Sequence, residues 1–422
     1  MGKTVALHTL GCKLNFSETS TIGRLLEADG FIKKEFSEIA DVYIINTCSV
    51  TENADKECRQ IVRKIQRKAP EALVVITGCY AQLKPKEIAA IPGVDLVLGA
   101  AEKFNIAEHL KEISKNDATK ICSCDVEDVN VFVPSYSINE RTRIFLKVQD
   151  GCDYNCSFCT IPMARGKSRS DEINNIIENV KSIAAGGAKE IVLTGINLGD
   201  FGKGYTGGKK HGENFFDLIK ELDALDGIER YRISSIEPNL LSNEIVEFVA
   251  NSKHFMPHFH IPLQSGSNNT LAAMRRRYKK ELYAEKVELI KLLMPNCCIG
   301  VDVIVGFPGE TNEDFAETVE FLRGLDISYL HVFTYSERDN THALSIKPVV
   351  PVHVRNERNK ILRNLSYEKM QAFTNKHIGQ ARKVLFESVN KNGMIEGYSD
   401  NYIKITAAYK KEWENEIVEW VI

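Results

Sequence analysis

VQDGCDYNCSFC, residues 148–159, places three cysteines in one short loop at the spacing C-x3-C-x2-C. The loop follows the apolar run Ile144–Gln149, which predicts a β-strand. A cubane iron–sulfur cluster normally takes four thiolates, so Cys152, Cys156 and Cys159 would hold it and leave one iron open to another ligand. The alternative is a zinc knuckle of three cysteines and one histidine, but the sequence offers no histidine close to this loop. We therefore interpret the loop as a cluster site.

Strand and helix signals alternate downstream of this loop. Besides Ile144–Gln149, strands are predicted at Glu190–Thr194, Tyr231–Ser235, His258–Pro262, Ile299–Val305 and Ile327–Tyr335. Helices are predicted between them at Asp171–Ala185, Phe215–Ala224, Asn243–Ala250, Asn268–Leu293 and Asn312–Leu325. The last helix has an asparagine cap and acidic residues in its first turn, as the helix dipole favours. Six β/α units are fewer than the eight of a closed barrel, so we predict an open partial TIM barrel.

A second set of three cysteines lies upstream, in an α/β pattern of about 115 residues. Strands are predicted at Thr4–Leu10, Val42–Asn46, Leu73–Thr77 and Asp95–Leu98, with helices at Ser17–Glu27 and Asp55–Lys68. This alternation predicts a parallel sheet with helices on both faces. Cys12, Cys48 and Cys79 each follow one of the first three strands, so they should meet at the carboxyl edge, where such sheets bind ligands. They predict a second cluster with one open iron; three independent buried thiols are the alternative.

The remaining segments complete the predicted organisation. Short strands separated by turn signals, at Arg382–Val389, Met394–Glu396, Tyr402–Thr406 and Glu416–Trp420, predict a small antiparallel β-barrel. The predicted fold class is therefore α/β, with a parallel-sheet domain, an open (β/α)6 barrel and a C-terminal antiparallel barrel. The predicted units are residues 1–115, a linker or ragged hairpin at 116–137, the core at 138–365 and the last domain at 366–422.

Composition excludes several classes of protein. The chain has 422 residues, 43% of them hydrophobic, and contains neither a long uncharged apolar stretch nor a signal-peptide pattern, so we expect a cytoplasmic protein without a membrane partner. Eleven cysteines in such a chain favour metal or redox chemistry over disulfides. The other five, for which packing or surface roles are expected, are Cys58, Cys122, Cys124, Cys297 and Cys298.

Two groups of basic residues are candidates for RNA contacts. Arg59, Arg63 and Arg67 recur every four residues on the helix after Cys48. The second group lies on the helix after the fourth barrel strand and contains Arg275, Arg276, Arg277, Lys279 and Lys280. A net charge of −3 argues against a protein that coats nucleic acid, and either group alone suits a solvated helix face. Two groups together with a β-barrel tail favour contacts to RNA phosphates.

With both sets of cysteines placed, the chain resembles the radical S-adenosylmethionine (SAM) methylthiotransferase family from end to end. The matching motifs are TLGCKLN, INTCSVTENADK, TGCYAQ and VQDGCDYNCSFCTIPMARGKSRS. The C-terminal domain is similar to the family's RNA-binding TRAM domain, although it is short. The fragments LTGINLGDFG, HFHIPLQSGS and MRRRY resemble most the branch that acts on threonylcarbamoyladenosine in tRNA.

The resemblance implies an activity and its cofactors. The branch converts N6-threonylcarbamoyladenosine at tRNA position 37, beside the anticodon, to its 2-methylthio form, with two 4Fe–4S clusters and SAM. One SAM methylates a sulfur on the cluster held by Cys12, Cys48 and Cys79, and a second is cleaved to a radical at the other cluster. An external electron donor and a sulfur donor are implied as well. Alternatives are action on isopentenyladenosine tRNA, action on a ribosomal-protein aspartate, and a non-catalytic iron–sulfur carrier.

Residues at the strand ends are candidates for contacts to SAM. Phe158, between the last two cysteines, could lie against the adenine. The others follow the second to fifth barrel strands and are Thr194, Gly195, Ser235, Glu237, Gln264, Ser265, Gly306 and Pro308. Glycine turns and polar strand ends occur in any barrel, so each assignment competes with a structural role. His258 and His260 share one strand face and could enter the barrel, but core roles are more common for such residues.

Overall fold

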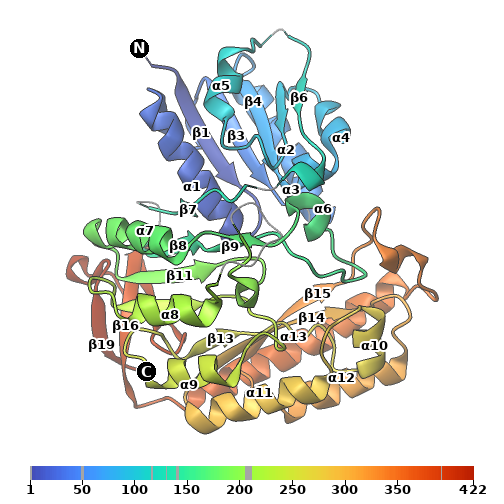
Figure 1. Cartoon of the computed structure of the whole chain (residues 1–422), viewed down its shortest axis with the longest axis vertical. Helices are drawn as coiled ribbons and strands as arrows, with labels where there is room; N and C mark the ends of the chain where they lie inside the picture. The colour runs from blue at the N-terminus through green and yellow to red at the C-terminus, as the bar shows by residue number, and fades with distance from the viewer. Residues whose placement is uncertain are drawn as a thin grey trace.

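The computed structural model describes residues 2–48, 52–115, 117–129, 131–138, 142–204, 212–390 and 392–422. Residue 116, the predicted start of the linker, and residues 49–51 of the second cysteine motif lie outside these ranges. The N-terminal sheet stands above the barrel in Figure 1, and the C-terminal sheet lies against one end of the barrel. Among the described helices none is long and apolar enough to cross a lipid bilayer.

The N-terminal domain is a six-stranded parallel sheet in the order β2-β1-β3-β4-β5-β6. Its strands are β1 (Thr4–Thr9), β2 (Ile32–Lys34), β3 (Val42–Thr47), β4 (Leu73–Gly78), β5 (Leu96–Leu98) and β6 (Lys120–Cys122). Its helices are α1 (Lys13–Ala28), α2 (Glu52–Lys68), α3 (Cys79–Leu83), α4 (Pro85–Ala89) and α5 (Ile106–Lys111). Two separate apolar clusters cover the two faces of the sheet, so the predicted parallel sheet is confirmed.

Three local predictions for this domain were incomplete or wrong. Strands β2 and β6 were not predicted, because these edge strands, Ile-Lys-Lys and Lys-Ile-Cys, contain no apolar run; β6 lies where the sequence suggested a linker. Helix α1 begins at Lys13 and is capped by Cys12, whereas the sequence suggested a start at Ser17. Ser17 lies inside the helix, where its hydroxyl donates to the carbonyl oxygen of Leu14 at 2.8 Å.

The central domain is an open barrel of six parallel strands. They are β8 (Arg143–Lys147), β11 (Glu190–Thr194), β12 (Arg230–Ile233), β13 (His258–His260), β14 (Cys298–Val305) and β15 (Tyr329–Thr334). The hydrogen-bonded orders are β12-β11-β8-β7 and β13-β14-β15, and a bridge between Ser235 and His260 joins the two sheets. Strand β7 (Ser135–Tyr136) runs antiparallel to β8, and β9 (Gln149–Asp150) pairs with β10 (Arg169–Ser170).

The helices of this domain pack outside the strands, except for the short α6, which lies against α3 of the N-terminal domain. They are α6 (Ile161–Arg165), α7 (Ile173–Ala185), α8 (Phe215–Asp223), α9 (Asn243–Asn251), α10 (Asn268–Ala273), α11 (Lys280–Leu293), α12 (Asn312–Gly324) and α13 (Val352–Asn375). The single helix predicted at 268–293 is two helices, because the chain turns at Arg275 with φ of 59°. The cap of α12 is Thr311 rather than Asn312, and its hydroxyl accepts from the backbone N–H of Asp314.

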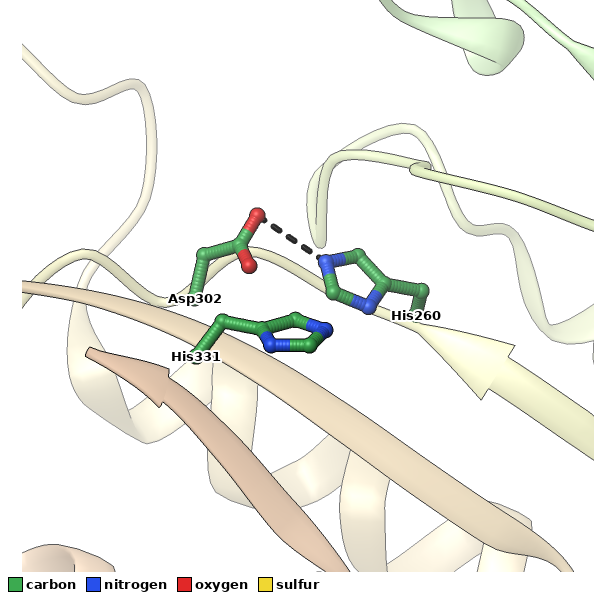
Figure 2. Close-up of side chains that lie close together, drawn as sticks. All are labelled: His260, Asp302 and His331. Atoms are coloured by element: carbon green, nitrogen blue, oxygen red, sulfur yellow. Dashed lines mark ion pairs between the residues drawn. The ribbon is translucent and has the colours of Figure 1, made fainter. Parts of the chain in front are cut away.

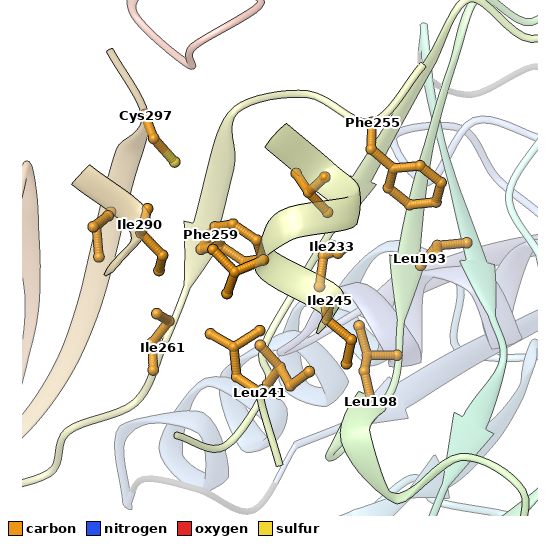
Figure 3. Packing of buried hydrophobic residues seen from close by; sticks show 14 of the residues in the cluster. Leu193, Leu198, Ile233, Leu241, Ile245, Phe255, Phe259, Ile261, Ile290 and Cys297 are labelled. Atoms are coloured by element: carbon orange, nitrogen blue, oxygen red, sulfur yellow. The ribbon is translucent and has the colours of Figure 1, made fainter. Parts of the chain in front are cut away.

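An apolar core lies between the strands and these outer helices (Figure 3). Val301, Val303 and Val305 of β14 belong to it, and successive strand side chains alternate between faces. The intervening residue Asp302 therefore faces the interior of the barrel. The same alternation on β15 turns His331 inward, since its neighbour Leu330 packs in the outer core. Asp302 and His331 thus turn their polar side chains to the inside of the barrel.

The C-terminal domain is a four-stranded antiparallel sheet in the order β18-β17-β16-β19. Its strands are β16 (Ala381–Val389), β17 (Met394–Ser399), β18 (Lys404–Ala408) and β19 (Ile417–Val421). The predicted antiparallel strands are confirmed, while β18 and β19 are the outer strands of this sheet and closure into a barrel is not seen in the described pairing. Tyr402, predicted to begin a strand, lies instead in a turn with φ of 69°.

The turn between β17 and β18 inserts into the amino-terminal end of the barrel. Arg232 of β12 donates to the backbone carbonyls of Ser399 at 2.8 Å and Asp400 at 2.9 Å. The ring of Tyr402 stacks on His258 of β13, with centroids 4.1 Å apart. The C-terminal domain is therefore built into the barrel wall rather than tethered beside it.

Candidate active site

The first set of cysteines gathers at the carboxyl edge of the N-terminal sheet. Cys12 caps α1 after β1, Cys48 follows β3, and Cys79 begins α3 directly after β4. These three strands are neighbours in the sheet. At Gly11 a Cβ atom would lie 2.5 Å from the Cβ of Cys48, and the φ of Gly11 is 108°. Only glycine allows the chain before Cys12 to pass so close to Cys48.

The second set lies in the loop between β9 and α6. The backbone N–H groups of Tyr154 and Ile161 donate to the sulfurs of Cys152 at 3.3 Å and Cys159 at 3.4 Å. The guanidinium of Arg276 donates to the sulfur of Cys156 at 3.2 Å. Each of the three sulfurs therefore accepts a hydrogen bond, which suits a thiolate.

Burial keeps these thiols protonated unless a metal replaces the proton. It raises the pKa of Cys152 to about 12, and that of Cys159 to about 12 as well. Burial also raises the pKa of Cys79, an effect that Arg165 opposes and Cys12 reinforces. All eleven cysteines lie within the described residues and are thiols rather than disulfides. Both sets thus fit iron–sulfur clusters, because a bound metal ion deprotonates a coordinating thiol.

A buried charge network joins the two sets across the domain interface. Arg165 of α6 donates to Glu18 of α1 at 3.0 Å, to Asp150 at 2.9 Å, and to the side-chain oxygen of Asn15 at 2.5 Å. Asn15 itself faces Cys12. The network contains four cations, Lys103, Lys147, Arg165 and Arg169, against the two carboxylates of Glu18 and Asp150. The excess of positive charge beside Cys12 and Cys79 favours an anionic cluster there.

Sequence reasoning did not find this network. Burial alone would raise the pKa of Glu18, but ion pairs with Arg165, Lys103 and Lys147 hold it well below its usual range. One signal was available, because Lys147 interrupts the apolar strand β8 and is 2% exposed. A charged side chain inside a buried strand requires a buried partner.

Two cavities open next to the cysteines. The larger, about 1410 Å³, is lined by Cys12, Lys13, Phe16, Arg143 and Tyr402, among others. The smaller, about 240 Å³, has a mainly apolar surface and touches Phe158, Cys159 and Gln264. Both sets of cysteines therefore border space that a ligand can occupy.

Comparison with known proteins identifies the family. Residues 4–99 match the family described as "Uncharacterized protein family UPF0004", and residues 146–322 match the radical SAM superfamily. The chain is 38% identical to the threonylcarbamoyladenosine tRNA methylthiotransferase MtaB of Bacillus subtilis, over 99% of this chain and 93% of that protein. It is 40% identical to the protein of the same name from Aquifex aeolicus, over 97% of both chains. The chain belongs to the radical SAM methylthiotransferases.

Other comparisons agree on the fold and on the wider family. A tRNA-2-methylthio-N(6)-dimethylallyladenosine synthase of Clostridium botulinum is 31% identical over 92% of this chain and 86% of that protein. Among solved structures, the radical SAM methyltransferase TsrM of Kitasatospora setae has a TM-score of 0.57 at 17% identity, covering 79% of this chain and 75% of that one. As a methylthiotransferase the chain is an enzyme, so the interpretation as a non-catalytic iron–sulfur carrier is not supported.

The candidate SAM residues of this methylthiotransferase fall into three groups. Phe158 and Gln264 line the smaller cavity beside Cys159, and Glu237 pairs with Arg276 next to Cys156. Gly195 and Ser235 lie at strand ends, Gly195 beside the side chain of Gln149 and Ser235 in the bridge to His260. The remaining four already make contacts within the protein. Thr194 donates to Leu146, Ser265 pairs with Thr318, the N–H of Gly306 donates to Glu310, and Pro308 is buried.

The candidate RNA residues separate in a similar way. Arg276 is turned inward to Cys156 and Glu237 with its side chain 4% exposed, so the predicted contact to RNA is wrong for this residue. Arg59 is paired with Glu87, whereas Arg63 and Arg67 are exposed on α2. The basic segment is mostly the turn before α11, which begins at Lys280, rather than a helix face, and its exposed members are Arg275, Arg277 and Lys279.

Proposed function

We propose that this methylthiotransferase adds a methylthio group to C2 of N6-threonylcarbamoyladenosine at position 37 of tRNA, with SAM and two 4Fe–4S clusters. Cys152, Cys156 and Cys159 would hold the cluster that binds SAM. Cys12, Cys48 and Cys79 would hold the second. The observation that carries the proposal is the pair of cysteine sets on facing edges of two domains, joined by the buried network around Arg165.

The cofactors would supply chemistry that no side chain offers, namely a reductively generated carbon radical for the unactivated C2–H bond and the methylthio group. The chain's own residues bind and orient. The cavity beside Phe158 and Gln264 suits the adenosyl part of SAM, because it is mostly apolar with a few polar groups. Glu237 and Arg276 form a buried pair at Cys156, and burial raises the pKa of Glu237 although Arg276 opposes this effect. An external reductant and a sulfur donor are parts of the proposal.

The choice of substrate rests on the relatives. Proteins named for threonylcarbamoyladenosine are 38% and 40% identical to this chain, against 31% for one named for dimethylallyladenosine. The anticodon arm would reach the domain interface, with its phosphates near the exposed Arg63 and Arg67. Such contacts act through counterion release, so binding should weaken steeply with salt.

The test uses purified, anaerobically reconstituted protein with SAM, reductant and modified anticodon stem-loops. The wild type should contain about eight irons per chain and convert the threonylcarbamoyl stem-loop, but not the isopentenyl one, to its methylthio form. Replacing Cys12, Cys48 and Cys79 by alanine should abolish the product while SAM is still cleaved to 5′-deoxyadenosine. A triple alanine variant of Cys58, Cys122 and Cys124 is the control and should keep both activities. Equal turnover of the two stem-loops would refute the assigned substrate.

A further inference from the structure

Lys13 is placed where it can act on a substrate but has no partner among the residues that the structure describes. It is the first residue of α1, next to Cys12, and it lines the larger cavity with Phe16, Arg143 and Tyr402. Within the described residues, its ammonium group makes no hydrogen bond or ion pair. Lys13 is exposed at the wall of this open cavity, so an anionic ligand that enters the cavity can reach its ammonium group and be attracted by its charge.

The charged groups around Lys13 already have partners. Its charge interacts with Asp302, Arg143 and Arg232. Asp302 pairs with His260 at 2.9 Å, Arg143 with Glu387 at 2.6 Å, and Arg232 with Glu190 at 2.8 Å. These carboxylates are therefore already paired with other groups. The lining of the cavity as a whole is net positive, because it contains five cations, Lys13, Arg24, Lys33, Lys34 and Arg143, against the three carboxylates of Glu27, Glu35 and Glu38.

A metal ion is the alternative occupant of this region. Figure 2 shows His260, Asp302 and His331 converging from β13, β14 and β15, and their ligand atoms lie within 4.8 Å of one another. The group has a single carboxylate, which is already paired with His260, and the charge of Lys13 acts on His331. A divalent cation would add to the positive charge, whereas an anion would reduce it. The electrostatics therefore favour an anion.

The geometry of adenine indicates which anion. C2 and the N6 substituent flank N1 on the same edge of the base. A group that binds the substituent must therefore lie near the group that delivers sulfur to C2, and Lys13 directly follows Cys12. The threonylcarbamoyl group ends in a carboxylate, whereas an isopentenyl group is apolar. We propose that Lys13 binds the carboxylate of the threonylcarbamoyl group and so selects this substrate. This assignment rests on the proposed function.

The experiment removes the charge on each side of the contact in turn. One anticodon stem-loop carries N6-threonylcarbamoyladenosine, and a second carries the same group with its carboxylate converted to a primary amide. The wild type should prefer the carboxylate by roughly 10- to 100-fold in kcat/KM, the range for a hydrogen bond to a charged group. Lys13→Gln should remove most of this preference, and Lys13→Arg should retain it. Lys33→Gln, which changes another lysine of the same cavity, is the matched control and should also retain it.

Iron content and SAM cleavage without RNA should be the same in all four proteins. If Lys13→Gln slows both stem-loops by the same factor, or raises the KM for SAM in the uncoupled reaction, the assignment is overturned, because Lys13 then serves the cluster or SAM. A wild type that converts both stem-loops equally well overturns it too. If the wild type cleaves SAM normally but methylthiolates neither stem-loop, the proposed function itself fails, and the role of Lys13 fails with it.

Discussion

Replacing Arg165 by methionine tests whether the buried network holds the two domains together. The Arg165 side chain is 3% exposed and donates to Glu18, Asp150 and Asn15 from one guanidinium group. Methionine keeps much of the volume but leaves two carboxylates and an amide oxygen buried without this donor. The change should therefore loosen α1 of the N-terminal domain and α6 of the barrel together.

The size of the effect follows from what remains after the substitution. Breaking a buried ion pair costs about 3–5 kcal/mol. Glu18 keeps Lys103 at 2.6 Å and Lys147 at 3.3 Å, and Asp150 keeps Arg169 at 3.1 Å, so we expect the lower limit of about 3 kcal/mol. This corresponds to roughly 100-fold in an opening equilibrium.

Hydrogen exchange is the suitable assay, because a chain of several domains need not unfold in one step. Amides of α1 and α6 should exchange roughly 100-fold faster in Arg165→Met than in the wild type. The matched control is Arg59→Met, since Arg59 also pairs with a carboxylate but its side chain is 43% exposed. An exposed pair contributes about 0–1 kcal/mol, so the control should change exchange by less than about tenfold. If both variants behave alike, or if only one of the two helices responds, the network does not join the domains.

Further predictions concern the glycine at the first cluster site, the C-terminal domain and acid stability. In Gly11→Ala the new Cβ would clash with Cys48, so the iron content should fall from about eight to about four atoms per chain while SAM cleavage persists. An unchanged iron content would show that the added Cβ does not disturb this site. Removing residues 381–422 takes away the carbonyl groups to which Arg232 donates, so the midpoint of thermal unfolding should fall. An unchanged midpoint would mean that the C-terminal domain does not stabilise the barrel. The ionised Glu18 stabilises the fold above about pH 4, the ordinary pKa of a glutamate, and this stabilisation is lost at lower pH. The free energy of unfolding should therefore fall less steeply with decreasing pH in Glu18→Gln than in the wild type. Equal slopes in the two proteins would show that the pKa of Glu18 is not lowered by folding.

Local patterns were sufficient for the order of the domains, the main strands and the two cysteine sets. An apolar run followed by a cysteine can be recognised within about ten residues and indicates a strand that ends at a possible ligand. Parallel strands bring their carboxyl ends to one edge of a sheet, so Cys12, Cys48 and Cys79 could be grouped from the sequence alone. The edge strands β2 and β6 have no such signal, because each contains lysine in place of an apolar run. The turn at Arg275 was missed because its neighbours on both sides have helical character.

The partners of charged side chains were decided only by tertiary structure. Arg276 stands in a basic run that suggests an exposed surface, yet the fold turns it to Cys156. Arg165 and Glu18 are 147 residues apart and meet only because α6 of the barrel packs on α3 of the N-terminal domain, which brings Arg165 within reach of α1. Lys13 can be named from the sequence as the neighbour of Cys12, but the lack of a partner for it among the described residues depends on every element around the cavity. Period and spacing are properties of neighbours along the chain, whereas the balance of buried charge is a property of the assembled interface.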